Sequence, residues 1–280
     1  MLTTKAADFI RSEHDLRPVV AIILGSGLGG LAEKIESPTA IPFHDIPGFG
    51  TSTAAGHRGQ LILGTIESVP VVTMAGRFHR YEGWSNTEVA FPVAVMHSLG
   101  CRSLIVSNAA GGVSPKLRVG NIVVIQDHIN LMGPHVVDRE DASNRERSVQ
   151  LDPPHFTRPA NTYDPILSAT ALGVAIREGF DAYPGTYLAT LGPNYETRAE
   201  YRMMRRIGAD VVGMSTVPEV LAASSLGMRI LGLSMVSNVA NPDQAVKANH
   251  EEVLHAGRAA EVKMEAIVRG VLRTFLSTSL

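Results

Sequence analysis

Apolar runs of strand length recur along the whole chain, and segments with helical periodicity lie between them. The runs are rich in Val, Ile and Leu and cover residues 19–24, 60–65, 70–75, 103–107, 121–125, 186–190, 209–213 and 229–237. Such runs, without polar alternation, are typical of a sheet that is covered on both faces. The alternation of strand and helix signals therefore predicts an α/β fold around a largely buried, mixed sheet.

The chain has no Gly/Ser-rich or Pro-rich linker between two cores, so we expect residues 1–280 to form a single domain. Residues 57–76 predict an antiparallel hairpin around Gly64 to Val69. The stretch 133–160, rich in charge and proline, is expected to be a surface or subunit-contact excursion. The last helix carries one apolar stripe, formed by Val253, Gly257, Ala260, Met264, Ile267, Val271 and Phe275.

The composition argues against several classes of partner. A net charge of −2 lacks the basic excess of nucleic-acid-binding proteins, despite the cluster of Arg202, Arg205 and Arg206. No stretch of about 18 apolar residues predicts a membrane span, and the N-terminus has no signal sequence. The single cysteine, Cys101, excludes an intramolecular disulfide and is expected to be buried. These features predict a cytoplasmic protein.

A glycine-rich loop follows the first apolar run, in the sequence VVAIILGSGLGG. The spacing Gly25-x-Gly27-x-x-Gly30 matches the dinucleotide-binding fingerprint, and Asp45 lies where the ribose-binding acid would be. However, Pro38, Pro42 and Pro47 crowd the place of the required second strand, and the helix after the glycines, from about Leu28 to Ile35, would be very short. The loop, with its backbone amides and the Ser26 hydroxyl, is better suited to a single anion such as phosphate.

Four predicted helix starts carry a capping-box pattern, and each lies next to a polar or aromatic residue that the helix does not need. The pairs are Ser85 with Glu88, Thr197 with Glu200, Thr216 with Glu219 and Asn249 with Glu252; the adjacent residues are Tyr81, Glu196, Ser215 and His250. Strand-to-helix junctions gather at one edge of an α/β sheet, where ligands bind. Polar loops alone explain any one of these residues, but together the four favour a composed site.

Further side chains that could bind an anion follow other strand-like runs. His57 lies in AGHRG, and Arg77, His79 and Tyr81 lie in GRFHRYEG. The forked guanidinium of an arginine suits phosphate recognition. A structural role remains the alternative for His57 and is our interpretation of His128, and the chain has none of the usual His or Cys spacings of a metal site.

Seven segments in this order resemble the trimeric, low-mass purine nucleoside phosphorylases: ILGSGLGGLA, STAAGHRGQL, AGRFHRYEG, SNAAGGV, DHINLMGP, GPNYETRAEYRMMRRIGADVVGMSTVPEV and KANHEEVLHAG. The resemblance covers about residues 18–260. It implies one α/β domain with a mixed, partly barrel-like sheet flanked by helices. It also implies a homotrimer that uses no metal or organic cofactor, with inorganic phosphate as co-substrate.

The resemblance also implies roles for individual residues. Phosphate would be held by Ser26, His57, Arg77, His79, Ala109 through its amide, and Ser215. The nucleoside would meet Tyr81, His79, Met214 and His250 at the ribose, and Tyr195, Glu196 and Asn238 at the base; Asn238, Glu196 and His79 would be catalytic. Thr216 would cap its helix and leave Ser215 for phosphate, while the helix dipole would keep His250 neutral.

The implied activity is phosphorolysis of inosine, guanosine and their deoxy forms in purine salvage. Phosphorylases of xanthosine or methylthioadenosine, a catalytically silent nucleoside-binding protein and a nicotinamide oxidoreductase are the alternatives. The sequence departs from the family at Ser237, often Thr, and at Val239, sometimes Lys. The loop 239–248 is shorter than in the mammalian forms, and the family's Arg-Phe-Gly segment has no clean match. Phe156 is the candidate for the aromatic that this segment carries into a neighbouring ribose site.

Overall fold

The computed structural model describes residues 2–25, 29–51, 58–133, 161–240 and 250–277, with the backbone alone for 250–259. Among these residues, nine strands form one sheet in the order β2-β3-β4-β1-β5-β8-β7-β6-β9. Their bounds are β1 Val20–Leu24, β2 Glu36–Pro42, β3 Gln60–Ile66, β4 Val69–Ala75, β5 Ser103–Gly112, β6 Ile122–Asn130, β7 Ala182–Ala189, β8 Val211–Gly213 and β9 Arg229–Val239. Strand β9 also pairs with β5, so β5, β8, β7, β6 and β9 close into a barrel. The predicted α/β fold with a mixed, partly barrel-like sheet is confirmed.

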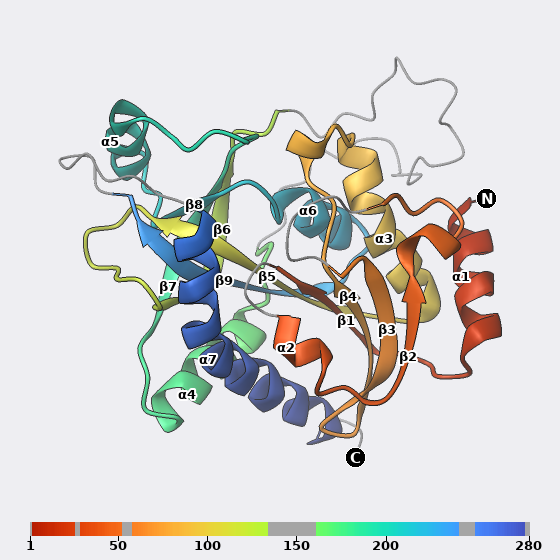
Figure 1. Cartoon of the computed structure of the whole chain (residues 1–280). Helices are drawn as coiled ribbons and strands as arrows, with labels where there is room; N and C mark the ends of the chain where they lie inside the picture. Colours follow the sequence, from red (N-terminus) through yellow and green to blue (C-terminus); the bar gives the residue numbers. More distant parts are fainter. Residues whose placement is uncertain (1, 26–28, 52–57, 134–160, 241–249, 278–280) are drawn as a thin grey trace.

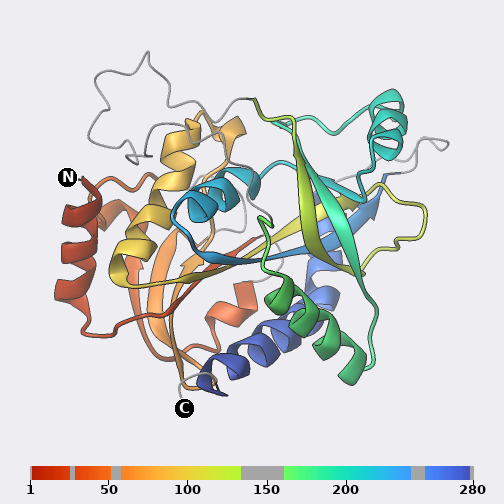
Figure 2. The same cartoon turned by 180° about the vertical axis from the view of Figure 1, so that it is seen from behind.

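Helices cover the sheet in two layers (Figures 1 and 2). Helices α1, α3 and α6 pack together on one side, and α2, α4 and α7 pack on the other. Helix α5 lies at the barrel end of the molecule. The helices are α1 Leu2–Glu13, α2 Gly29–Ala32, α3 Asn86–Leu99, α4 Pro165–Arg177, α5 Arg198–Arg206, α6 Val217–Ser225 and α7 His250–Ser277, with short 3-10 turns η1 Phe43–Asp45 and η2 Arg80–Glu82.

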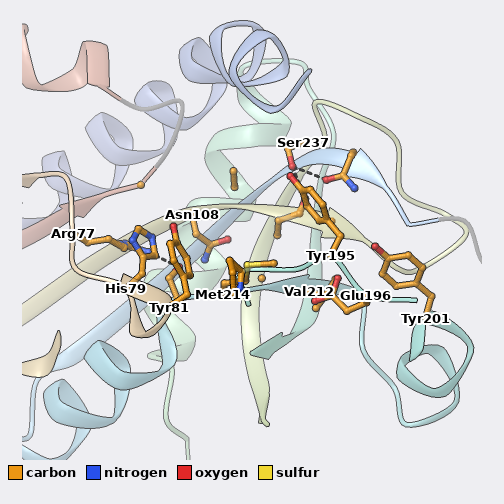
Figure 3. Close-up of a pocket in the computed structure, with 18 residues that line it drawn as sticks. Arg77, His79, Tyr81, Asn108, Tyr195, Glu196, Tyr201, Val212, Met214 and Ser237 are labelled. Atoms are coloured by element: carbon orange, nitrogen blue, oxygen red, sulfur yellow. Dashed lines mark hydrogen bonds between the residues drawn. The ribbon is translucent and has the colours of Figure 1, made fainter. Parts of the chain in front are cut away.

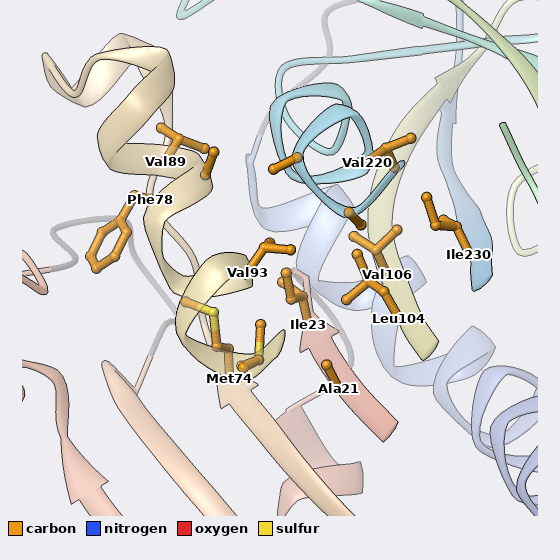
Figure 4. Packing of buried hydrophobic residues seen from close by; sticks show 14 of the residues in the cluster. Ala21, Ile23, Met74, Phe78, Val89, Val93, Leu104, Val106, Val220 and Ile230 are labelled. Carbon is orange, nitrogen blue, oxygen red and sulfur yellow. The ribbon is translucent and has the colours of Figure 1, made fainter. Parts of the chain in front are cut away.

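Strand β1 shows why the apolar runs become central strands. All five of its residues are buried, and it pairs in parallel with β4 and β5. Ala21 and Ile23 face the layer of α3 and α6 (Figure 4), whereas Ile22 and Leu24 pack in the cluster that contains α7. A strand buried on both faces needs apolar side chains at every position, which is the continuous pattern in the sequence.

The expected hairpin is present as β3 and β4, which pair antiparallel from Gln60–Ala75 to Ile66–Val69. Its turn consists of Glu67 and Ser68, both with positive φ (51° and 60°), as a two-residue hairpin turn of this hand requires. Glu67 also accepts hydrogen bonds from Arg269 and Arg273 of α7, and these lower the pKa of its carboxyl to about 2.

The segment with Pro38, Pro42 and Pro47 was expected not to form a strand, and this expectation needs a correction. A strand, β2, does run through Pro38 and Pro42, but it is an antiparallel edge strand paired with β3. An edge strand tolerates proline because one side of its backbone has no partner strand to bond. A dinucleotide unit instead needs a parallel strand after the glycine loop, and α2 has only four residues. The dinucleotide alternative therefore fails on topology.

Several smaller predictions can be checked against the described residues. Cys101 is buried, and burial raises the pKa of its thiol to about 12. The stripe on α7 is confirmed at its described positions Ala260, Met264, Ile267 and Val271, which are buried, while Phe275 is half-buried. The excursion 133–160, including Phe156, lies outside the described residues, apart from Gly133 at its start. In the part of the chain that the structure describes, no helix is long and apolar enough to cross a membrane.

Gly25 lets the end of β1 approach β5 closely. A Cβ at this position would lie 2.5 Å from the Ser107 carbonyl oxygen and 2.8 Å from the Asn108 Cα, both backbone atoms. The Gly25 amide meanwhile donates to Ser107 Oγ at 3.3 Å. At the other end of the loop the Gly30 amide donates to Glu261 Oε1. This amide of the predicted anion-binding loop therefore already binds a carboxylate of the protein.

We expect Gly25→Ala to lower the free energy of unfolding by about 2–3 kcal/mol, because the added methyl group forces two backbones apart. Gly29→Ala is the matched control in the same loop, since a Cβ there meets nothing within 4 Å. Urea unfolding followed by circular dichroism measures both. Equal stabilities of the two variants would contradict the close-approach explanation.

Candidate active site

A cavity of about 340 Å³ lies where the ends of β1, β4, β5, β8 and β9 come together with the segment after β7. Figure 3 shows the labelled side chains around it, most of them from these elements and Tyr201 from α5. Nine predicted site residues line the cavity, namely Arg77, His79, Tyr81, Ala109, Tyr195, Glu196, Met214, Ser215 and Asn238. Ser26, His57 and the side chain of His250 lie outside the described residues.

Arg77 anchors one end of the cavity, and its side chain is almost completely buried (2% exposed). Its Nη1 donates to Ser215 Oγ at 2.8 Å and to Thr216 Oγ1 at 3.1 Å, and its Nη2 donates to the Ser107 carbonyl at 2.7 Å. Its Nε lies 3.5 Å from the Glu219 carboxylate, which is also buried. Burial raises the pKa of Glu219, and the Arg77 charge opposes that shift.

The capping hydrogen bond predicted from the Thr216 side chain is absent. Thr216 has φ 76° and ψ −47°, and its side chain makes no capping hydrogen bond to α6. Its hydroxyl instead contacts Arg77 and Asn108, and Glu219 turns into the core toward Arg77. The buried charge of Arg77 therefore recruits both groups that the pattern assigns to the helix end. Ser215 is likewise held by Arg77 before any ligand binds.

The other capping predictions have different outcomes. The boxes at Ser85–Glu88 and Thr197–Glu200 are confirmed. Asn249, and with it the box to Glu252, lies outside the described residues.

His79 and Tyr81 form a stacked pair beside Arg77, with ring centroids 4.7 Å apart and an interplanar angle of 18°. His79 Nδ1 lies 2.7 Å from Glu82 Oε1, which also accepts the His79 amide at 3.0 Å. A buried carboxylate at one ring nitrogen fixes the orientation of the ring beside Arg77. Tyr81 keeps 39% of its surface exposed.

A β-bulge brings Ser237 and Asn238 into the cavity together. Strand β9 pairs with β5 as Ala110–Val236 and then Gly111–Asn238, which leaves Ser237 as an extra residue. Successive residues of a regular strand face opposite sides, but a bulge re-aims them, and both residues line the cavity. Ser237 Oγ has two acceptors in reach, Asn238 Oδ1 at 2.9 Å and the Ala110 carbonyl at 3.2 Å. When its one proton goes to Oδ1, the Asn238 NH₂ is left to donate to a ligand.

Glu196 lies at the opposite end of the cavity from Arg77 (Figure 3). Its Oε1 accepts the Thr190 hydroxyl at 2.9 Å. Tyr201 of α5 hydrogen-bonds to the same carboxylate, and burial together with this contact raises the pKa of Tyr201 to about 12. Tyr195, beside them, is 45% exposed. This end is thus polar and more open than the Arg77 end.

Sequence reasoning missed Thr190, Tyr201, Asn108 and Glu82. Tyr201 and Glu82 each lie within five residues of a predicted site residue. A polar residue a few positions from a candidate was the available signal. Asn108 directly follows the predicted run 103–107, and a polar residue at the end of a strand was its available signal.

Two predictions concern side chains outside the site. His128 is structural as predicted, since its Nδ1 lies 3.2 Å from the Tyr163 hydroxyl and burial lowers its pKa. Among the described residues, no three His, Cys, Asp or Glu side chains gather as a metal site requires.

Comparison with known proteins agrees with this geometry. A family model described as "Phosphorylase superfamily" matches residues 19–273. Purine nucleoside phosphorylase 1 of Bacillus subtilis is 42% identical over 97% of each chain, and the purine nucleoside phosphorylase of Rattus norvegicus is 43% identical over 94% of this chain and 91% of its own. The chain therefore belongs to the phosphorylase superfamily and, within it, to the purine nucleoside phosphorylases.

A solved structure gives the same picture. It is isoform 2 of the purine nucleoside phosphorylase from Schistosoma mansoni, described in complex with cytosine and ribose-1-phosphate. It has a TM-score of 0.86 and 37% identity, and the match covers 97% of this chain and 95% of that one.

The buried pair of Arg77 and Glu219 should behave as a coupled unit. We expect Glu219→Leu to cost about 3–5 kcal/mol of unfolding free energy, because it leaves the buried guanidinium without its carboxylate. The double variant Arg77→Met/Glu219→Leu should be more stable than the sum of the two single losses implies. Urea unfolding at pH 7 measures this cycle, and additive losses would show that the two side chains are independent.

Proposed function

We propose that this protein cleaves the glycosidic bond of purine nucleosides with inorganic phosphate, giving the free base and ribose 1-phosphate. One observation carries the proposal. A single cavity has buried anion-binding donors, Arg77 and Ser215, at one end and an amide and a carboxylate, Asn238 and Glu196, at the other. A nucleoside placed between them has its sugar next to phosphate and its base next to the hydrogen-bonding pair.

Phosphate lies, in this proposal, against Arg77, His79, Ser215 and the Ala109 amide, with Ser26 and His57 completing its shell. The buried guanidinium supplies charge-assisted donors, the strongest kind for a phosphate dianion, and Glu82 holds the His79 ring in place beside it. Ribose lies against Tyr81, His79 and Met214, and His250 meets its 5′-hydroxyl.

The purine lies between Asn238, Glu196 and Tyr195. As the bond breaks, the ribose gains oxocarbenium character and the base gains negative charge. Asn238 donates to N7 where this charge develops, and Glu196 holds the N1 side of a 6-oxopurine. The phosphate stabilises the cation and then captures C1′. The fixed orientation of the Asn238 amide supports this role, because preorganised donors act without reorganising during the reaction.

Inosine, guanosine and their deoxy forms are the proposed substrates, since a protonated N1 of a 6-oxopurine donates to the Glu196 carboxylate. Xanthosine and methylthioadenosine phosphorolysis are the alternatives within the class. A silent nucleoside-binding protein is the alternative outside it.

We expect hypoxanthine release from inosine that depends on added phosphate, with guanosine cleaved comparably and adenosine and methylthioadenosine far more slowly. Chromatography of the released bases, with and without phosphate, measures all substrates including xanthosine. Binding of inosine without release would favour the silent protein, and faster cleavage of adenosine would reverse the base preference.

Asn238→Ala should lower kcat by about 10²- to 10³-fold, because it removes a donor that acts on the departing base. The KM for phosphate should change less than threefold, since Asn238 contacts the base end. Ser237→Ala keeps the amide but removes the hydroxyl that orients it, and a drop of about tenfold in kcat is expected. Unchanged turnover in Asn238→Ala would remove Asn238 from the mechanism.

We also propose that residues 1–280 act as one domain of a cytoplasmic homotrimer in purine salvage, without a metal or organic cofactor. The partial exposure of Tyr81 and Tyr195, at 39% and 45%, supports a neighbouring subunit that completes the site. The mass of the particle in solution, compared with 29.9 kDa for one chain, tests the trimer.

A further inference from the structure

Four buried polar side chains form a continuous hydrogen-bonded row from β9 to the anion end of the cavity. Ser234 Oγ lies 2.8 Å from Asn108 Oδ1, and Asn108 Nδ2 lies 2.9 Å from Thr216 Oγ1. Thr216 Oγ1 in turn lies 3.1 Å from Ser215 Oγ. Each of the four residues is at most 8% exposed, so water does not compete for these bonds.

Arg77 gives this row a direction. A guanidinium only donates, and Nη1 donates to both Thr216 Oγ1 and Ser215 Oγ. Thr216 also accepts from the Asn108 amide, which fills its two lone pairs. The proton of the Thr216 hydroxyl must then go to Ser215 Oγ. With bonds from Arg77 and Thr216, Ser215 has no acceptor capacity left and can only donate its own proton.

The Ser215 proton has a weak acceptor within the protein and a strong one in the ligand. The Tyr187 phenol oxygen is in hydrogen-bonding contact with the Ser215 side chain and also accepts its amide at 3.4 Å. A phosphate dianion accepts far more strongly than a phenol. Because Ser215 lines the cavity, its hydroxyl can turn to such an anion without losing a bond that it accepts.

The backbone of Thr216 supports a functional reason for this arrangement. Its φ of 76° is rare for a β-branched residue and costs of order 1–3 kcal/mol. A threonine at a helix start ordinarily uses its hydroxyl to cap helix amides. Here the strained backbone aims the hydroxyl away from α6, between Asn108 and Ser215.

We propose that Thr216 is a positioning residue for phosphate. With Asn108 and Ser234 behind it, Thr216 forms a one-way hydrogen-bond row that holds Ser215 as an obligatory donor to the anion. This inference rests on the proposed function, in which phosphate occupies the Arg77 end of the cavity.

The test compares Thr216→Val with Ser215→Ala and with the double variant. Ser215→Ala should raise the phosphate KM about tenfold, the effect of one hydrogen bond to a charged group. Thr216→Val should raise it about five- to tenfold and leave the inosine KM within twofold. In the double variant the phosphate KM should exceed that of Ser215→Ala by less than twofold, because both changes remove the same donor.

Two variants serve as controls. Thr216→Ser keeps the hydroxyl and should bring the phosphate KM back to within threefold of the unaltered protein. Thr73→Val makes the same substitution at another fully buried threonine, whose hydroxyl has no hydrogen-bond partner in the described residues, and should not change the phosphate KM. If Thr216→Val does not fold, Ser234→Ala replaces it, with an expected rise of about two- to fourfold in the phosphate KM.

Calorimetric titration with inorganic phosphate gives a second readout that does not depend on turnover. A phosphate KM within twofold of the unaltered protein in Thr216→Val, or independent effects in the double variant, would overturn the proposal. If the unaltered protein does not cleave inosine, the proposed function fails. In that case the proposed role of Thr216 is tested only by the calorimetric phosphate affinities of the same variants. Equal affinities in the variants and the unaltered protein would overturn it.

Discussion

The buried guanidinium of Arg77 is the interaction on which the site depends. A charge with 2% exposure is tolerated only when its donors are satisfied and a counter-charge is near. Its partners include the carbonyl of Ser107 in β5, the hydroxyls of Ser215 and Thr216 after β8, and the carboxylate of Glu219 in α6. Satisfying one cation therefore fixes a strand, a strained junction and a helix relative to one another, and the anion end of the cavity follows from that.

The sequence was sufficient to predict the strands that are buried on both faces. Continuous apolar runs gave the central strands, and eight of the nine strands fall on the predicted runs. The missing strand, β2, contains Pro38 and Pro42 and lacks a continuous apolar run, because an edge strand is not buried on both faces. Closure of the barrel was implied by the family resemblance. It depends on the pairing of β9 with both β5 and β6, a long-range register that periodicity alone does not encode.

At the site, residue identities were predictable and their contacts were less so. Local patterns supplied five of the nine candidates that line the cavity, because strand ends and helix starts meet there, and the family resemblance supplied the other four. Thr216 and Glu219 matched a capping box in sequence, yet a long-range demand from Arg77 overrode the local preference. The bulge at Ser237 could not be predicted either, because one extra residue in a strand does not change the pattern of an apolar run.

The two ends of the cavity differ in how many buried contacts hold them in place. Tyr201, which bonds to Glu196, belongs to α5, where only Met204 is buried and Arg205 reaches the carbonyls of Val113 and Ala240. At the opposite end, Arg77 and Ser215 directly follow the strands β4 and β8 and are themselves buried. A segment with few buried contacts opens at a small fraction of the global unfolding free energy. Partial unfolding can therefore loosen the wall around Glu196 while the Arg77 wall keeps its shape. Substitutions in α5 are therefore expected to alter the base preference with the smallest loss of unfolding free energy.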